Sequence, residues 1–114
     1  MANVVEEKSF LFAIRIVRLY QYLHSKKKEF VLSKQLLRSG TSIGANVAEA
    51  QQAQSRADFL SKINIALKEA AETEYWLRLL RATDYMAEKE FRSIYDDCEQ
   101  VKKLLVSIVK STKE

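Results

Sequence analysis

The stretch RSGTSIGANVAEA, Arg38–Ala50, holds both glycines of a 114-residue chain that contains no proline. Such a stretch is compatible with three structures: a phosphate-binding loop, the turn of a helix-turn-helix, or a continuous helix packed closely against a neighbour. The choice decides the fold, because the rest of the chain offers few of the residues from which turns are built.

The two loop interpretations lack the residues that they require. A phosphate-binding loop follows a strand and, in its P-loop form, closes with Lys-Ser/Thr, and the sequence has neither. A helix-turn-helix needs apolar residues near offsets of about −5, +1, +6 and +9 from its turn glycine. Counted from Gly40, those positions are polar: Gln35, Thr41, Asn46 and Glu49.

A continuous helix explains the same residues. At about 100° per residue, Leu36, Ile43 and Val47 point in one direction and predict a core-facing stripe. The small residues Gly40, Gly44 and Ala48 lie on one flank, where a partner backbone that approaches closely would offset the roughly 1 kcal/mol that each glycine costs. The other flank is polar. It comprises Ser39, Ser42, Asn46 and Glu49, and we expect it to lie at a subunit contact, with a ligand or nucleic-acid site as the alternative.

Hydrophobic periodicity divides the chain into four helical segments. Apolar residues cover a wide arc of the first helix, which suggests more than one neighbour, and regular stripes of apolar residues mark the third and fourth. The expected segments run from Val5 or Ser9 to Ser25, from Ser33 to about Gln54, from Ser55 to about Asp84, and from Glu88 onward. Ser33 and Ser55 are the expected N-caps of the second and third segments, with Asp58 close to the capping-box position. Short connections make neighbouring helices antiparallel, so residues 1–114 are predicted to form one all-α domain, an up-down-up-down four-helix bundle.

The charge pattern is asymmetric. The net charge is +4, and residues 1–54 carry eight Lys/Arg against four Asp/Glu, whereas residues 55–114 carry eleven of each. The bundle topology would gather several basic residues at one end and form a surface for phosphates of RNA or DNA, although solvated helix ends would give the same pattern. The residues concerned are Lys26, Lys27, Lys28, Lys34, Arg38, Arg78 and Arg81.

Other function classes are disfavoured by what the sequence lacks. The single histidine, His24, and the single cysteine, Cys98, cannot supply a multi-residue metal site, and no nucleophile with a base and an orienting group is apparent. Cys98 lies on an apolar stripe and is predicted to be buried. We expect no enzyme activity, no cofactor and no small-molecule substrate. No apolar run reaches the length of a membrane span, so a cytoplasmic location and no membrane partner are expected.

The run from Phe30 to Leu80 resembles a known bacterial family of four-helix bundles, first named for proteins encoded in intervening sequences of the 23S ribosomal RNA gene. The first and fourth helices fit the family more loosely, so the resemblance covers essentially the whole chain. The resemblance rests on four groups of residues: Gln35-Leu36-x-Arg38-Ser39, Ser42-Ile43-x-Ala45-Asn46-Val47-Ala48-Glu49, Asp58-Phe59 with Ile65-Ala66, and Glu72-x-Glu74-x-x-Leu77. Members often have glycine where this chain has Ala50, so the second helix is expected to end less sharply.

The resemblance implies a left-handed bundle, often assembled as a ring of five, whose biochemical role is largely unestablished. It also implies that Arg38, Ser39, Ser42, Asn46 and Glu49 occupy signature positions. A relative with the same fold, the accessory protein of diversity-generating retroelements, resembles a basic ring that binds nucleic acid and a reverse transcriptase. A non-enzymatic oligomer that binds nucleic acid is therefore the expectation, with a structural or protein-interaction module as the alternative.

Overall fold

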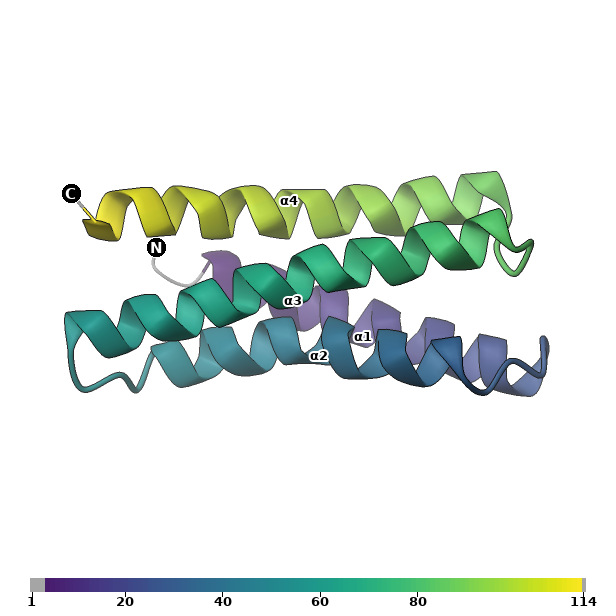
Figure 1. The fold of residues 1–114 in the computed structure, drawn as a ribbon, viewed down its shortest axis with the longest axis horizontal. Helices are drawn as coiled ribbons and strands as arrows, with labels where there is room; N and C mark the ends of the chain where they lie inside the picture. The colour runs from purple at the N-terminus through teal and green to yellow at the C-terminus, as the bar shows by residue number, and fades with distance from the viewer. Residues whose placement is uncertain (1–3, 114) are drawn as a thin grey trace.

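A computed structural model describes residues 4–113 of the chain. Within these residues four helices form the whole fold (Figure 1). Their bounds are α1 Val4–Ser25, α2 Leu32–Ala50, α3 Arg56–Ala82 and α4 Glu88–Lys113. The bundle measures 44 × 20 × 20 Å, as expected for helices of this length lying side by side.

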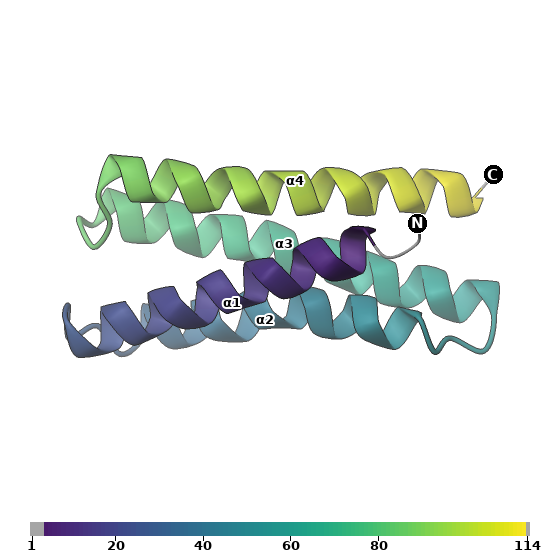
Figure 2. The same cartoon turned by 180° about the vertical axis from the view of Figure 1, so that it is seen from behind.

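Each connection is short, so consecutive helices run antiparallel, as predicted. The α1–α2 and α3–α4 connections lie together at one end of the bundle, and the α2–α3 connection lies at the other (Figures 1 and 2). Helix α2 packs against both α1 and α3, whereas α1 meets α4 least closely. The view from behind shows α1 running obliquely to α4 (Figure 2).

The predicted stripes of α2, α3 and α4 form the core. Leu36, Ile43 and Val47 of α2 are fully buried, and the stripe of α3 is buried at every position from Ile63 to Leu80. The stripe of α4 includes Cys98, which is buried as predicted. Burial raises the pKa of its thiol to about 12, so the thiolate that would react is scarce at neutral pH.

Helix α1 buries only part of its apolar arc. Phe12 and Ile16 lie in the core, but the side chains of Phe10 and Ile14 on the adjoining face are 66% and 40% exposed. The sequence predicted more than one neighbour for this helix. Within one chain the second apolar face of α1 remains uncovered.

Helix α2 runs without a break through Gly40 and Gly44, and neither glycine has positive φ. Its ends differ from the predicted ones. Ser33 is not the N-cap, because the helix begins at Leu32 and the carboxylate of Glu29 accepts the first backbone N–H groups. The helix ends at Ala50 and not at Gln54, since the backbone N–H of Gln51 closes a tight final turn on Ala48.

The start of α3 confirms its predicted cap, because the hydroxyl of Ser55 accepts the N–H of Asp58 at 3.0 Å. The acidic residues of α3 do not pair as spacing along one helix favours, which would join Glu69, Glu72 and Glu74 to bases such as Lys62, Lys68 and Arg78. Their partners lie on other helices. Arg38 of α2 pairs with Glu69 and Glu72, and Lys102 of α4 pairs with Glu74 at 2.9 Å. These ion pairs tie α3 to both neighbours.

Candidate nucleic-acid interface

The seven predicted basic residues occupy three elements that meet at one end of the bundle. Lys26, Lys27 and Lys28 form the α1–α2 connection, and Lys34 and Arg38 follow in the first two turns of α2. Arg78 and Arg81 lie in the last turns of α3. Because both connections share this end (Figure 1), we call these seven residues the basic end.

Two members of the basic end are neutralised by ion pairs. Arg38 pairs with Glu69 and Glu72, and Arg81 pairs with Glu88. Hydrogen bonds from Arg92 and from Arg81 hold the pKa of Glu88 below its usual range. These two arginines therefore hold helices together and offer less charge to a ligand.

The other five members have no carboxylate partner in the part of the chain that the structure describes. Within residues 4–113, no Asp or Glu oxygen lies within 4.0 Å of the charged nitrogens of the five. All five side chains are exposed: Lys26, Lys27, Lys28, Lys34 and Arg78. Exposed cations without local partners are the groups that contact phosphates at least cost, because no ion pair has to break.

Glu29 interrupts the basic end in sequence but offers it little negative surface. The residue is only 7% exposed, and its carboxylate accepts backbone N–H groups of Val31, Leu32 and Ser33 at 3.2, 2.9 and 2.7 Å. Burial raises its pKa, but these hydrogen bonds outweigh the burial, so the pKa lies below its usual range. Glu29 thus fixes the start of α2, and its negative charge interacts with the positive end of the helix dipole and not with the lysines.

Aromatic side chains flank these lysines, and the charge pattern of the sequence did not predict them as site residues. Phe30 is 51% exposed and Tyr22 is 40% exposed. The ring of His24 meets that of Phe30 edge to face, with centroids 4.8 Å apart. The ammonium of Lys27 lies 6.0 Å from the centre of the Tyr22 ring. The signal is present in the sequence as YLHSKKKEF, an aromatic on each side of a lysine run.

The small-residue flank of α2 packs on α1. A Cβ atom added to Gly40 would lie 2.7 Å from Cγ1 of Ile16, and one added to Gly44 would lie 3.3 Å from the backbone oxygen of Ser9. The glycines thus allow α1 to approach within the same chain. Ala48, the third member, is exposed.

The polar flank of α2 faces α3. The hydroxyl of Thr73 donates to that of Ser39 at 2.9 Å, and both residues are fully buried. The amide of Asn46 donates to the backbone oxygen of Ser42, and Lys62 pairs with Glu49 at 3.2 Å. Ser39 is therefore engaged inside the chain, while Glu49 keeps an exposed side chain.

A model of the family described as 23S rRNA-intervening sequence protein matches residues 2–107. The chain belongs to this family. It is also similar to a solved protein of unknown function from the S23 ribosomal protein family of Bacteroides thetaiotaomicron, with 61% identity, a TM-score of 0.95, and coverage of 96% of this chain and 97% of that one. The comparison with curated proteins gave no match.

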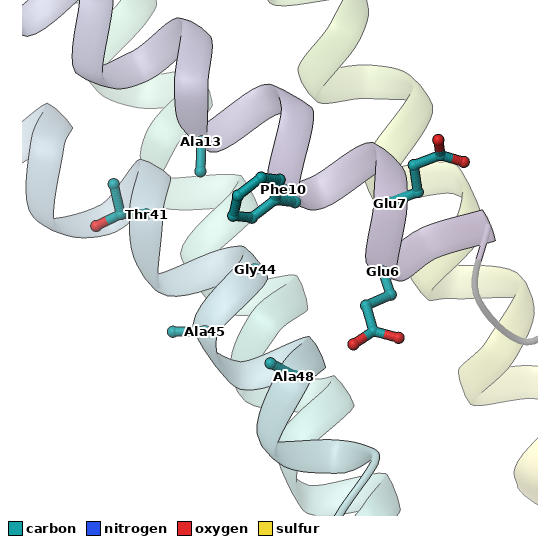
Figure 3. A pocket seen from close by; sticks show the side chains of 8 residues that line it. All are labelled: Glu6, Glu7, Phe10, Ala13, Thr41, Gly44, Ala45 and Ala48. Atoms are coloured by element: carbon teal, nitrogen blue, oxygen red, sulfur yellow. The ribbon is translucent and has the colours of Figure 1, made fainter.

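Beside the small-residue flank lies a groove of about 650 Å³ between α1 and α2. Figure 3 shows Phe10 and Ala13 on its α1 side and Thr41, Ala45 and Ala48 on its α2 side, with Glu6 and Glu7 at the rim. The lining is apolar apart from this rim and Thr41.

Metal and membrane sites find no support in the described residues. Across residues 4–113, no three His, Cys, Asp or Glu side chains gather as a metal site would require. The four helices described here include none that combines the length and apolarity of a transmembrane segment.

Proposed function

We propose that the protein is a non-enzymatic homo-oligomer that binds RNA or another nucleic acid through phosphate contacts at the basic end. The observation that carries this proposal is a set of five exposed cations without carboxylate partners among residues 4–113, gathered from the α1–α2 connection, α2 and α3 at one end of the molecule. Lysine and arginine contacts to phosphates release counterions, and their contribution to affinity does not depend on the base sequence. The modest +4 charge of the chain suits such binding when several copies act together.

The direct test changes Lys26, Lys27 and Lys28 to Glu and measures RNA affinity by fluorescence anisotropy. A matched control changes Lys68, Lys103 and Lys110, which are exposed on α3 and α4, and alters the net charge by the same amount. We expect the first triple variant to lose most of its affinity and the control to keep most of it. Equal losses in both would show that only net charge matters, and unchanged binding in the first would overturn the proposal.

The salt dependence of binding gives an independent readout. The logarithm of the affinity should fall linearly with the logarithm of salt concentration, and replacing three phosphate-contacting lysines should reduce that slope by about 2 to 3. A wild-type protein that shows no RNA affinity at about 50 mM salt would reject the function outright.

We propose five copies for the oligomer, as the family resemblance implies, with the uncovered face of α1 as the assembly surface. Phe10, Leu11 and Ile14 are between 40% and 66% exposed, more than a monomer of this size usually leaves along one helix. A ring of five would carry about +20, enough to attract RNA strongly. Light scattering that gives a monomer would reject the ring, and Phe10→Ser should dissociate it.

A structural or protein-interaction module is the second candidate. The groove beside Phe10 and the exposed face of α1 favour it, since they could bind another protein without any role for the basic end. An apolar protein interface would respond little to salt, whereas RNA binding would respond steeply. Measuring the affinity for the partner at increasing salt concentrations therefore distinguishes the two candidate functions.

A further inference from the structure

The α1–α2 connection exposes apolar side chains together with its lysines. Phe30 and Val31, two and three residues after Lys28, are 51% and 70% exposed, and Tyr22, one turn before the lysines, is 40% exposed. None of the three is needed for the core, which Leu23 and Leu36 fill at the same level of the bundle. Apolar exposure at this position therefore calls for a ligand that contacts both rings and charges.

The backbone holds Phe30 in place. On one side the N–H of Glu29 donates to the backbone oxygen of Leu23 at 3.0 Å, and on the other side the Glu29 carboxylate accepts the N–H of Val31 at 3.2 Å. The ring itself is braced by the edge-to-face contact with His24. A braced ring loses little conformational entropy when a ligand stacks on it.

We infer that the basic end binds single-stranded RNA, with an unpaired base stacked on Phe30 and the phosphates held by Lys26–Lys28. This inference rests on the proposed RNA binding and specifies the kind of strand. An exposed ring beside cations is the arrangement by which proteins bind single strands without sequence preference, because every base has a π-face. In a duplex the base faces are stacked on each other, so the protein meets phosphates, 2′-hydroxyls and base edges but no free base face on which Phe30 could stack.

The neighbouring charges fit this inference. The one acid within the connection, Glu29, is turned into the start of α2 by its three backbone hydrogen bonds. A strand that follows the connection therefore meets rings and ammonium groups without an opposing carboxylate from Glu29.

The experiment compares two probes on the same variants: an oligouridine of about 16 nucleotides and an RNA duplex of the same length. Phe30→Ala should weaken oligouridine binding about fivefold to a hundredfold, the range for loss of one stacked base, and should change duplex binding less than about twofold. Phe30→Trp keeps a π-face and should restore oligouridine binding, whereas Phe30→Leu keeps apolar bulk and should not.

Tyr75→Ala is the matched control, because Tyr75 is 52% exposed on α3 and has no part in the basic end. Circular dichroism melts of every variant confirm that the bundle is folded, so a loss of binding is not a loss of structure. Phe30→Trp provides a folded comparison even if Phe30→Ala unfolds.

These measurements distinguish a failure of the proposed RNA function from a failure of the stacking inference. If wild-type protein binds neither probe, the proposed RNA function fails. Suppose instead that the wild type binds RNA and the lysine variant binds it more weakly, so that the phosphate site stands. The stacking inference is then overturned if Phe30→Ala leaves oligouridine affinity unchanged, or weakens the binding of oligouridine and duplex equally. If Phe30→Ala changes the oligomeric state and leaves RNA affinity unchanged, Phe30 serves contacts between copies, and the inference is again overturned.

Discussion

The two flanks of α2 solve the same packing problem by different means. Toward α1 the helix has Gly40 and Gly44, and the fit is one of shape, with Ile16 and the backbone at Ser9 filling the space that side chains would occupy. Toward α3 it has Ser39 and Glu49, and the fit is one of hydrogen bonds and ion pairs. The two kinds of contact on one helix therefore tolerate different substitutions. A shape contact resists added atoms, whereas a polar contact resists the loss of one partner.

The largest effect is expected where shape is tightest. Gly40→Val should destabilise the protein by about 3 kcal/mol, because even its Cβ would lie 2.7 Å from the fully buried Ile16 and its branched methyl groups add to the crowding. Urea unfolding monitored by circular dichroism measures the change. A companion variant, Gly40→Ala with Ile16→Ala, should be less destabilised than the two single variants together. A Gly40→Val protein within about 0.5 kcal/mol of wild type would show that the α1–α2 contact is looser than described.

A smaller effect, of about 1 to 2 kcal/mol, is expected across the polar flank. Thr73→Val keeps the shape of the side chain but leaves the buried hydroxyl of Ser39 without the partner that it has at 2.9 Å. Adding Ser39→Ala removes the stranded group, so the double variant should be less destabilised than the sum of the singles. Strictly additive losses in a double-mutant cycle would show that the two hydroxyls are not coupled.

The carboxylate of Glu29 caps the start of α2 and should contribute about 1 kcal/mol to the free energy of unfolding. Glu29→Gln loses the charge that accepts N–H groups from Val31, Leu32 and Ser33. The folded-state pKa of Glu29 is lowered, so its contribution is present above the unfolded value near 4.5 and disappears as pH falls through the folded value. Stability measured against pH should therefore fall less steeply below about pH 4.5 in Glu29→Gln than in wild type. Glu90→Gln, on an exposed side chain of α4, is the control and should leave the profile unchanged.

Much of this arrangement was predictable because it follows from periodicity. The core stripes of α2, α3 and α4, the Ser55 cap and the burial of Cys98 all depend on spacing along one helix. The partner of each surface charge was not predictable in the same way. Local spacing favoured pairs within α3, but Arg38 and Lys102 reach across from α2 and α4. The distances between helices that decide such pairs depend on the tertiary packing.

At the basic end, too, the positions of the charges were predictable from the sequence and their partners were not. The topology placed both connections together, so the sequence could name its seven cations. It could not say that carboxylates would engage Arg38 and Arg81, while Lys26–Lys28 would have no carboxylate partner among residues 4–113. Nor did a count of charges draw attention to Phe30, whose exposure depends on how Glu29 anchors the chain on both sides of it.

The smallest effect should appear at Gly44, four residues from the position where the largest is expected. Gly44→Ala gains about 1 kcal/mol of helix propensity, since alanine is ordered more easily than glycine. Against this gain, its Cβ would lie 3.3 Å from the backbone oxygen of Ser9, so α1 must move by a few tenths of an ångström. The terms oppose each other, and we expect a net change within about 0.5 kcal/mol by urea unfolding. Because α1 is covered by α2 but only sparsely by α4, it has room to make that shift. A loss comparable to that of Gly40→Val would show that the backbone of α1 is held as rigidly as the side chain of Ile16. A gain of the full helix propensity would show that α1 moves away freely, and that only Gly40 sets the distance between the two helices.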